Sequence, residues 1–141
     1  MTNDPHALVW PAFAMATLTL AVWSRMFSVR IGEMRRLRIH PQSVATSTQA
    51  AQRLVDTRAA DNFRNLFELP VLFYAALGIA FALHAADVVT LTLAWVFVAL
   101  RFAHSGIQCG YNRVMHRFGV YVGGAATLWL LWGWLAWRAV G

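Results

Sequence analysis

Four long apolar segments constrain this chain more than any other feature of its sequence. They cover about residues 7–27, 58–84, 88–110 and 117–138. Each is long enough to cross the hydrocarbon core of a bilayer, which takes roughly 20 helical residues. Because lipid offers no hydrogen bonds, the backbone of such a segment must satisfy its own N–H and C=O groups by forming a helix. The sequence therefore predicts an all-α fold, an integral membrane four-helix bundle with residues 1–141 in a single domain.

The composition agrees with an exterior that faces lipid. Hydrophobic residues make up 59% of the 141 positions and charged residues only 13%, whereas a soluble domain of this size needs more polar surface. All twelve basic residues are arginine. Beside apolar spans these arginines favour anionic lipid headgroups as partners and not nucleic acid. Cys109 is the only cysteine, and the histidines lack the spacing of metal ligands, so no metal site is expected.

The arginines are distributed unevenly between the connecting segments. Seven lie between residues 24 and 58 and two between the third and fourth spans, but none precedes the first span or lies in the short link 84–87. By the positive-inside rule, both long links are cytoplasmic and both termini face outward. The absence of lysine and the many alanines and arginines indicate a GC-rich bacterial genome, and hence a bacterial inner membrane.

This topology leads to a first prediction. A periplasmic reporter enzyme fused to either terminus should be active, and a reporter that functions only in the cytoplasm should be silent there, because the arginine-rich links stay inside. Activity of the cytoplasmic reporter at either terminus would contradict the assigned orientation. The cytoplasmic reporter inserted in the first link, where it should be active, provides the internal control.

Polar residues enter the second and third spans along helical stripes. Asn65 and Glu68 lie on one face of the second span, and Arg101, His104 and Gln108 on one face of the third. A charge at the bilayer centre costs about 2.5 kcal/mol or more unless it faces protein or water. The stripes are therefore expected to point into the bundle or toward a partner subunit.

The second span carries further local signals. Arg64 and Glu68 lie four residues apart, so they are expected to form an ion pair on one helix. An ion pair that only locks helices together is an alternative role for Glu68. Pro70 removes the hydrogen bond to the carbonyl of Leu66, which predicts a kink. From Thr48 onward, the pattern is compatible with one long helix that enters the membrane.

The sequence contains two blocks of spaced polar residues, Arg58-x6-Asn65-x2-Glu68-x-Pro70, then Arg101-x2-His104, Arg113-x3-Arg117 and Tyr121. These blocks resemble the MAPEG family, the membrane-associated proteins of eicosanoid and glutathione metabolism. The microsomal glutathione transferases and the prostaglandin E synthase are the closest members by this resemblance, which covers roughly residues 53–125. It implies a homotrimer with a polar cleft between neighbouring subunits near the cytoplasmic face.

The resemblance also implies glutathione as the bound thiol and a role for six residues. Arg117 matches the catalytic arginine that activates the thiol, since a nearby guanidinium lowers a thiol pKa. The lipid side of the cleft would admit a lipophilic small molecule. The expected activity is a glutathione-dependent transferase or peroxidase. The glutathione-binding positions are Arg64, Asn65, Glu68, Arg113 and Tyr121.

Two positions depart from the family pattern. Asp61 stands where the enzymes place an arginine that contacts glutathione, and Gln108 stands where they place a tyrosine. An added negative charge disfavours an anionic peptide. The alternative function is therefore a non-catalytic trimeric membrane adaptor or lipid-binding protein that has lost glutathione dependence. Asn65, Glu68 and Arg117 favour the enzyme, whereas Asp61 and Gln108 favour the alternative.

Overall fold

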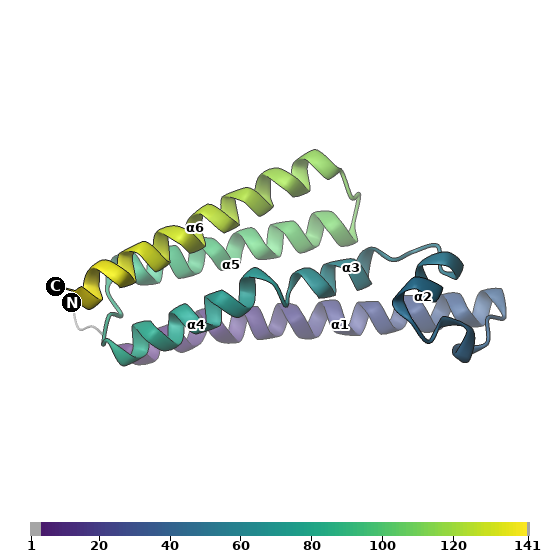
Figure 1. The fold of residues 1–141 in the computed structure, drawn as a ribbon, viewed down its shortest axis with the longest axis horizontal. Helices are drawn as coiled ribbons and strands as arrows, with labels where there is room; N and C mark the ends of the chain where they lie inside the picture. Colours follow the sequence, from purple (N-terminus) through teal and green to yellow (C-terminus); the bar gives the residue numbers. More distant parts are fainter. Residues whose placement is uncertain (1–3, 141) are drawn as a thin grey trace.

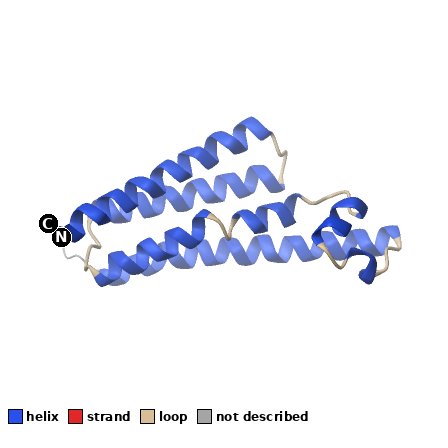
Figure 2. Cartoon of the chain, viewed as in Figure 1, coloured by secondary structure: helices blue, strands red, loops and turns tan. Residues whose placement is uncertain are grey.

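The structure, a computed structural model, describes residues 4–140. Helices joined by short loops account for these residues, which contain no strand (Figures 1 and 2). Two of the elements are short 3-10 helices and six are α-helices. They are η1 (Pro5–Leu8), α1 (Val9–Leu37), η2 (Pro41–Val44), α2 (Ser47–Arg53), α3 (Arg58–Asn65), α4 (Leu69–Ala82), α5 (Val88–Cys109) and α6 (Val114–Val140).

Four helical stretches are long and apolar enough to cross a membrane, in agreement with the four predicted spans. They are Pro5–Leu37, Arg58–Ala82, Val88–Cys109 and Val114–Val140. As expected, the third stretch stays helical after Leu100 and ends only at Cys109. The first helix continues beyond residue 27 and ends at Leu37, where Arg38 adopts a left-handed conformation with φ of 53°.

The second stretch is broken into two helices. A turn at residues 66–68 separates α3 from α4, and Pro70 lies in the first turn of α4, where a missing N–H breaks no intrahelical hydrogen bond. The kink predicted from Pro70 is thus present as a complete break. The expectation of one long helix from Thr48 is wrong, because α2 ends at Arg53 and residues 54–57 are not helical.

The helices run antiparallel along one long axis, so the connecting segments are sorted between two ends (Figure 1). Both ends of the described chain and the link 83–87 lie at one end. The links 38–57 and 110–113 lie at the other. Residues 24–58 and 110–117, which together hold nine of the twelve arginines, therefore lie toward the same end of the bundle, as the charge distribution requires. The side of the membrane that each end faces stays a prediction.

The core is apolar and lies between the membrane-spanning helices. Phe73 of α4 stacks on Phe97 of α5 with ring centroids 4.6 Å apart, and both are fully buried, as are Met15 and Leu128. Large apolar side chains also cover the outside of the helices; Trp129, for example, is 59% exposed. An exterior of this kind suits hydrocarbon and not water.

Beyond the apolar part of the bundle, the C-terminal half of α1 holds the link 38–57 in place (Figure 1). Glu33 is buried, and its carboxylate accepts hydrogen bonds from the backbone N–H groups of Val55 (2.8 Å) and Asp56 (3.3 Å). Nη2 of Arg30 donates to the carbonyl of Val44 at 2.7 Å. Two side chains of α1 thus hold the link at two places, at η2 and at the segment between α2 and α3.

This contact leads to a second prediction. Glu33→Ala leaves two backbone N–H groups without their acceptor, which should cost roughly 1–3 kcal/mol of local stability. Hydrogen exchange at Val55 and Asp56 should accelerate correspondingly, while exchange in α5 stays unchanged. Arg36→Ala, an exposed substitution on the same helix, is the control. Equal protection of Val55 in Glu33→Ala and the parent would contradict the assigned role.

Candidate functional site

A stripe of buried polar side chains on α5 forms the centre of the site. Arg101, His104, Ser105 and Gln108 are all at most 4% exposed. Their spacing of three and four residues places them on one helical face, as predicted for Arg101, His104 and Gln108. Because polar groups are costly to bury alone, neighbouring helices must supply partners for this face.

Helix α3 supplies three hydrogen bonds to this region of α5. Ser105 Oγ donates to Oδ1 of Asn62 at 3.2 Å, and Nδ2 of Asn62 donates to Sγ of Cys109 at 3.4 Å. One turn further along α3, Nδ2 of Asn65 donates to Oε1 of Gln108 at 3.0 Å. The two asparagines therefore fix α3 against the last two turns of α5.

Helix α6 closes the other side of the stripe. His104 Nε2 lies 2.9 Å from Oε1 of Gln108, and His104 Nδ1 lies 3.3 Å from the carbonyl oxygen of Arg117. The ring of Tyr121 packs at 5.7 Å from the His104 ring. A continuous series of polar contacts thus runs from Asn65 on α3, through α5, to the first turns of α6.

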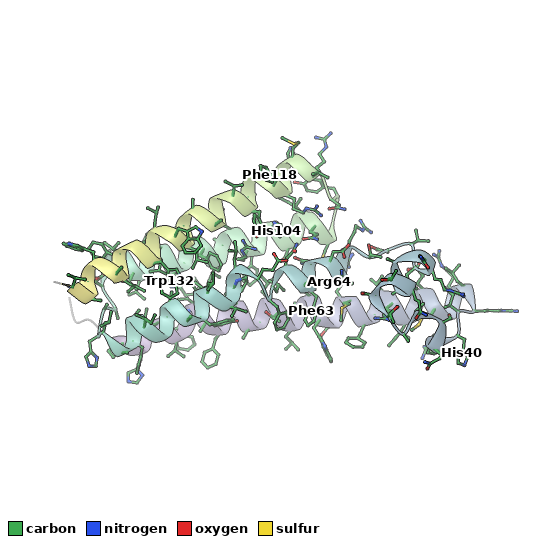
Figure 3. The ribbon with its side chains drawn as sticks, in the orientation of Figure 1. His40, Phe63, Arg64, His104, Phe118 and Trp132 are labelled. Atoms are coloured by element: carbon green, nitrogen blue, oxygen red, sulfur yellow. The ribbon has the colours of Figure 1, made fainter. Side chains whose placement is uncertain are left out.

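A cavity of about 190 Å³ lies beside this series, between α5 and α6. Figure 3 labels two of its lining residues, His104 and Phe118. The Arg117 side chain is held at the start of α6 because its Nη1 donates to Oδ1 of Asn112 at 3.0 Å. The cavity therefore combines a guanidinium with apolar walls. Its lining residues are His104, Val114, Arg117, Phe118 and Tyr121.

Arg101 has an unusual environment. Its guanidinium carbon lies 4.9 Å from the ring centroid of Tyr121 and 5.3 Å from that of Phe97, within the range of cation–π attraction. A β-carbon at Gly124 would lie 3.3 Å from Nη2 of Arg101, so the glycine leaves room for the cation. Within residues 4–140, no group hydrogen-bonds to its three side-chain nitrogens. The site therefore holds unused hydrogen-bond donors.

Two arginines from distant parts of the chain hold the end of α5. Arg25 Nη2 donates to the carbonyl of Cys109 at 2.9 Å, and Arg58 Nη1 donates to the carbonyl of Gly110 at 2.6 Å. Positive charge is favourable at a helix C-terminus. Asp56 orients Arg58 through hydrogen bonds at 2.8 and 2.9 Å. The same guanidinium lowers the pKa of the Asp56 carboxyl, because hydrogen bonds to the ionised form favour it.

The structure brings together three of the six residues predicted for the site. Asn65, Arg117 and Tyr121 belong to the connected series or line the cavity. Arg64, Glu68 and Arg113 do not: all three are exposed. The roles assigned to all six residues stay predictions.

The predicted ion pair between Arg64 and Glu68 is wrong. Helix α3 ends at Asn65, so the two residues no longer share the i, i+4 geometry of one helix. Arg64, which Figure 3 labels, instead lies 3.7 Å from the carboxylate of Asp61. Among the described residues, no ion pair within 4 Å joins Glu68 to Arg64 or to Arg101.

Sequence reasoning missed part of the site. It placed Arg101, His104 and Gln108 on one stripe but gave them no role, and it overlooked Asn62 and Ser105. The available signal was spacing: Asn62 lies three residues before Asn65, and Ser105 lies four after Arg101. The pairing between the two helices leaves no mark in a single sequence.

The fold and the buried polar stripe define a multi-pass helical membrane protein whose polar site lies inside the bundle. More specifically, the chain belongs to the MAPEG family, whose sequence profile matches residues 8–137. The predicted family and the predicted multi-pass membrane class are thereby confirmed. Comparisons with curated proteins and with solved structures find no match.

Proposed function

We propose that this protein is a glutathione-dependent transferase or peroxidase that acts on lipophilic substrates at the membrane boundary. The observation that carries the proposal is the position of Arg117. Its side chain lines a cavity with His104 and Tyr121, and its backbone carbonyl is connected to Asn65 through the hydrogen bonds of His104 and Gln108. An arginine beside a small cavity at the start of a membrane helix suits an anionic thiol that meets an apolar acceptor.

The residues of the site fit glutathione chemically. Glutathione is a net anion with several carboxylate and carbonyl oxygens, and guanidinium and amide donors bind such oxygens well. The guanidinium of Arg117 beside the sulfur would lower the thiol pKa and raise the thiolate fraction at neutral pH. The thiolate would then form a carbon–sulfur bond with a lipophilic electrophile as the bond to the leaving group breaks. With a lipid hydroperoxide, cleavage of the O–O bond would give the alcohol and water, and a second glutathione would complete the oxidised disulfide. Val114 and Phe118, exposed by 63% and 61%, form an apolar approach from the lipid side.

A homotrimer is part of this proposal. Arg64, Glu68 and Arg113 are exposed on single chains, and such charges near a bilayer are favourable only beside water or other protein. A neighbouring subunit would bring these groups, which the family resemblance assigns to glutathione binding, to a shared cleft. The family membership supports this arrangement.

The role of Arg117 leads to a third prediction. Arg117→Ala should remove the ultraviolet signal of the glutathione thiolate and weaken binding by roughly 1.5–3 kcal/mol, the usual value of a charged hydrogen bond. The mass in mild detergent, corrected for detergent, should stay that of a trimer, because Arg117 lies in the first turn of α6 and is only half-buried. Arg53→Ala, on exposed α2, is the matched control. Full thiolate formation in Arg117→Ala would rule out the proposed activation.

The departure at Asp61 leads to a fourth prediction. Its half-exposed carboxylate accepts a hydrogen bond from Thr57 Oγ1 (3.0 Å) and lies 3.7 Å from Arg64, so replacing it empties no core position. Asp61→Arg should tighten glutathione binding by about 1–3 kcal/mol, as expected when a repulsive charge becomes attractive. Calorimetry is the measurement, and Asp61→Asn should give an intermediate affinity.

The same titration decides between the two functions. If neither the parent nor Asp61→Arg binds glutathione at millimolar concentration, the transferase proposal fails. A non-catalytic adaptor or lipid-binding protein then becomes the better description.

A further inference from the structure

We propose that Gln108 determines whether Asn65 presents a hydrogen-bond donor or an acceptor to a ligand. It does so by coupling the orientation of the Asn65 amide to the tautomer of His104. The inference deepens the proposed function and rests on it for the identity of the ligand. Gln108 is 2% exposed and lies between α3 and α6. It occupies one of the two positions at which this chain departs from the family pattern.

The hydrogen bonds around Gln108 contain a conflict. Its Oε1 lies 3.0 Å from Asn65 Nδ2 and 2.9 Å from His104 Nε2, so as an acceptor it requires a proton on Nε2. His104 is 3% exposed, and burial favours the uncharged ring. A neutral imidazole carries only one N–H, which leaves Nδ1 without a proton. Yet Nδ1 lies 3.3 Å from the carbonyl oxygen of Arg117, itself an acceptor. One contact of the series would then join two acceptors.

A half-turn of both side-chain amides removes this conflict. The nitrogen of Gln108 then occupies the position of its oxygen, and its two hydrogens point to Nε2 of His104 and to Oδ1 of Asn65. His104 carries its proton on Nδ1 and donates it to the carbonyl of Arg117. All three contacts are now donor to acceptor, and buried polar groups are nearly always satisfied in this way. We therefore assign this arrangement to the ligand-free protein.

This arrangement determines which atom of the Asn65 amide remains free to bind a ligand. Within residues 4–140, no hydrogen bond reaches the second amide atom of Asn65, whose side chain is half-buried. With Oδ1 bonded to Gln108, this second atom is the NH₂ nitrogen, a donor. A donor selects carboxylate or carbonyl oxygens, whereas the opposite arrangement would select an ammonium or amide N–H. Gln108 is thus a specificity-determining residue for ligands rich in acceptors.

The test reads the His104 tautomer directly. Full-length protein with ¹⁵N-labelled histidine in detergent micelles is examined by NMR without ligand, and His104→Asn identifies the His104 signals. The parent should carry a proton on Nδ1 and none on Nε2. Gln108→Glu, whose carboxylate only accepts, should place a proton on Nε2. A proton on Nε2 in the parent, or an unprotonated Nε2 in Gln108→Glu, overturns the inference.

A second variant keeps the test decisive if Gln108→Glu does not fold. Asn65→Asp can only accept from Gln108, so it should retain the parental tautomer. A proton on Nε2 in this variant also overturns the coupling. A merely structural role of Gln108 would predict the same tautomer in all folded variants.

Glutathione affinity, measured by calorimetry, separates this inference from the proposed function. Gln108→Glu should weaken binding about tenfold or more, whereas Gln108→Leu, which leaves Asn65 free to turn, should weaken it less than about threefold. If the parent shows the expected tautomer but does not bind glutathione, the proposed function fails and the coupling stands. If glutathione binds but the parent carries its proton on Nε2, the function stands and the coupling fails.

Discussion

The buried polar face of α5 is the constraint on which the rest of the structure depends. A helix in hydrocarbon has no water to hydrogen-bond its polar side chains, so Ser105 and Gln108 require partners on neighbouring helices. Asn62 and Asn65 on α3 supply them. The way α3 packs against α5 therefore follows from polar satisfaction as much as from apolar burial.

The break between α3 and α4 allows one span to serve two purposes. Helix α4 is almost entirely apolar and contributes Phe73 to the core, whereas α3 is polar and contributes Asn62 and Asn65 to the site. A single straight helix would fix the rotation of one face relative to the other. The turn at residues 66–68, followed by Pro70, allows α3 and α4 to differ in their rotation about the helix axis.

The number of spans, their helical character and the stripe on α5 could be predicted because each depends on local composition and periodicity. The prediction of an Arg64–Glu68 ion pair failed because it assumed an unbroken helix, and the proline signal gave the position of a kink without its size. The contact between Asn65 and Gln108 could not be predicted either, because it joins residues 43 apart in sequence. The roles expected for Arg64, Glu68 and Arg113 rest on the proposed homotrimer and stay predictions.

The anchoring of the α5 C-terminus by Arg25 and Arg58 has a consequence for a residue on the next helix. The two carbonyls that they hold, those of Cys109 and Gly110, begin the short turn that delivers Arg117. The placement of Arg117 therefore depends on two residues that neither line the cavity nor take part in the series of polar contacts beside it. A substitution at Arg25 or Arg58 would therefore shift Arg117 without altering any residue that lines the cavity.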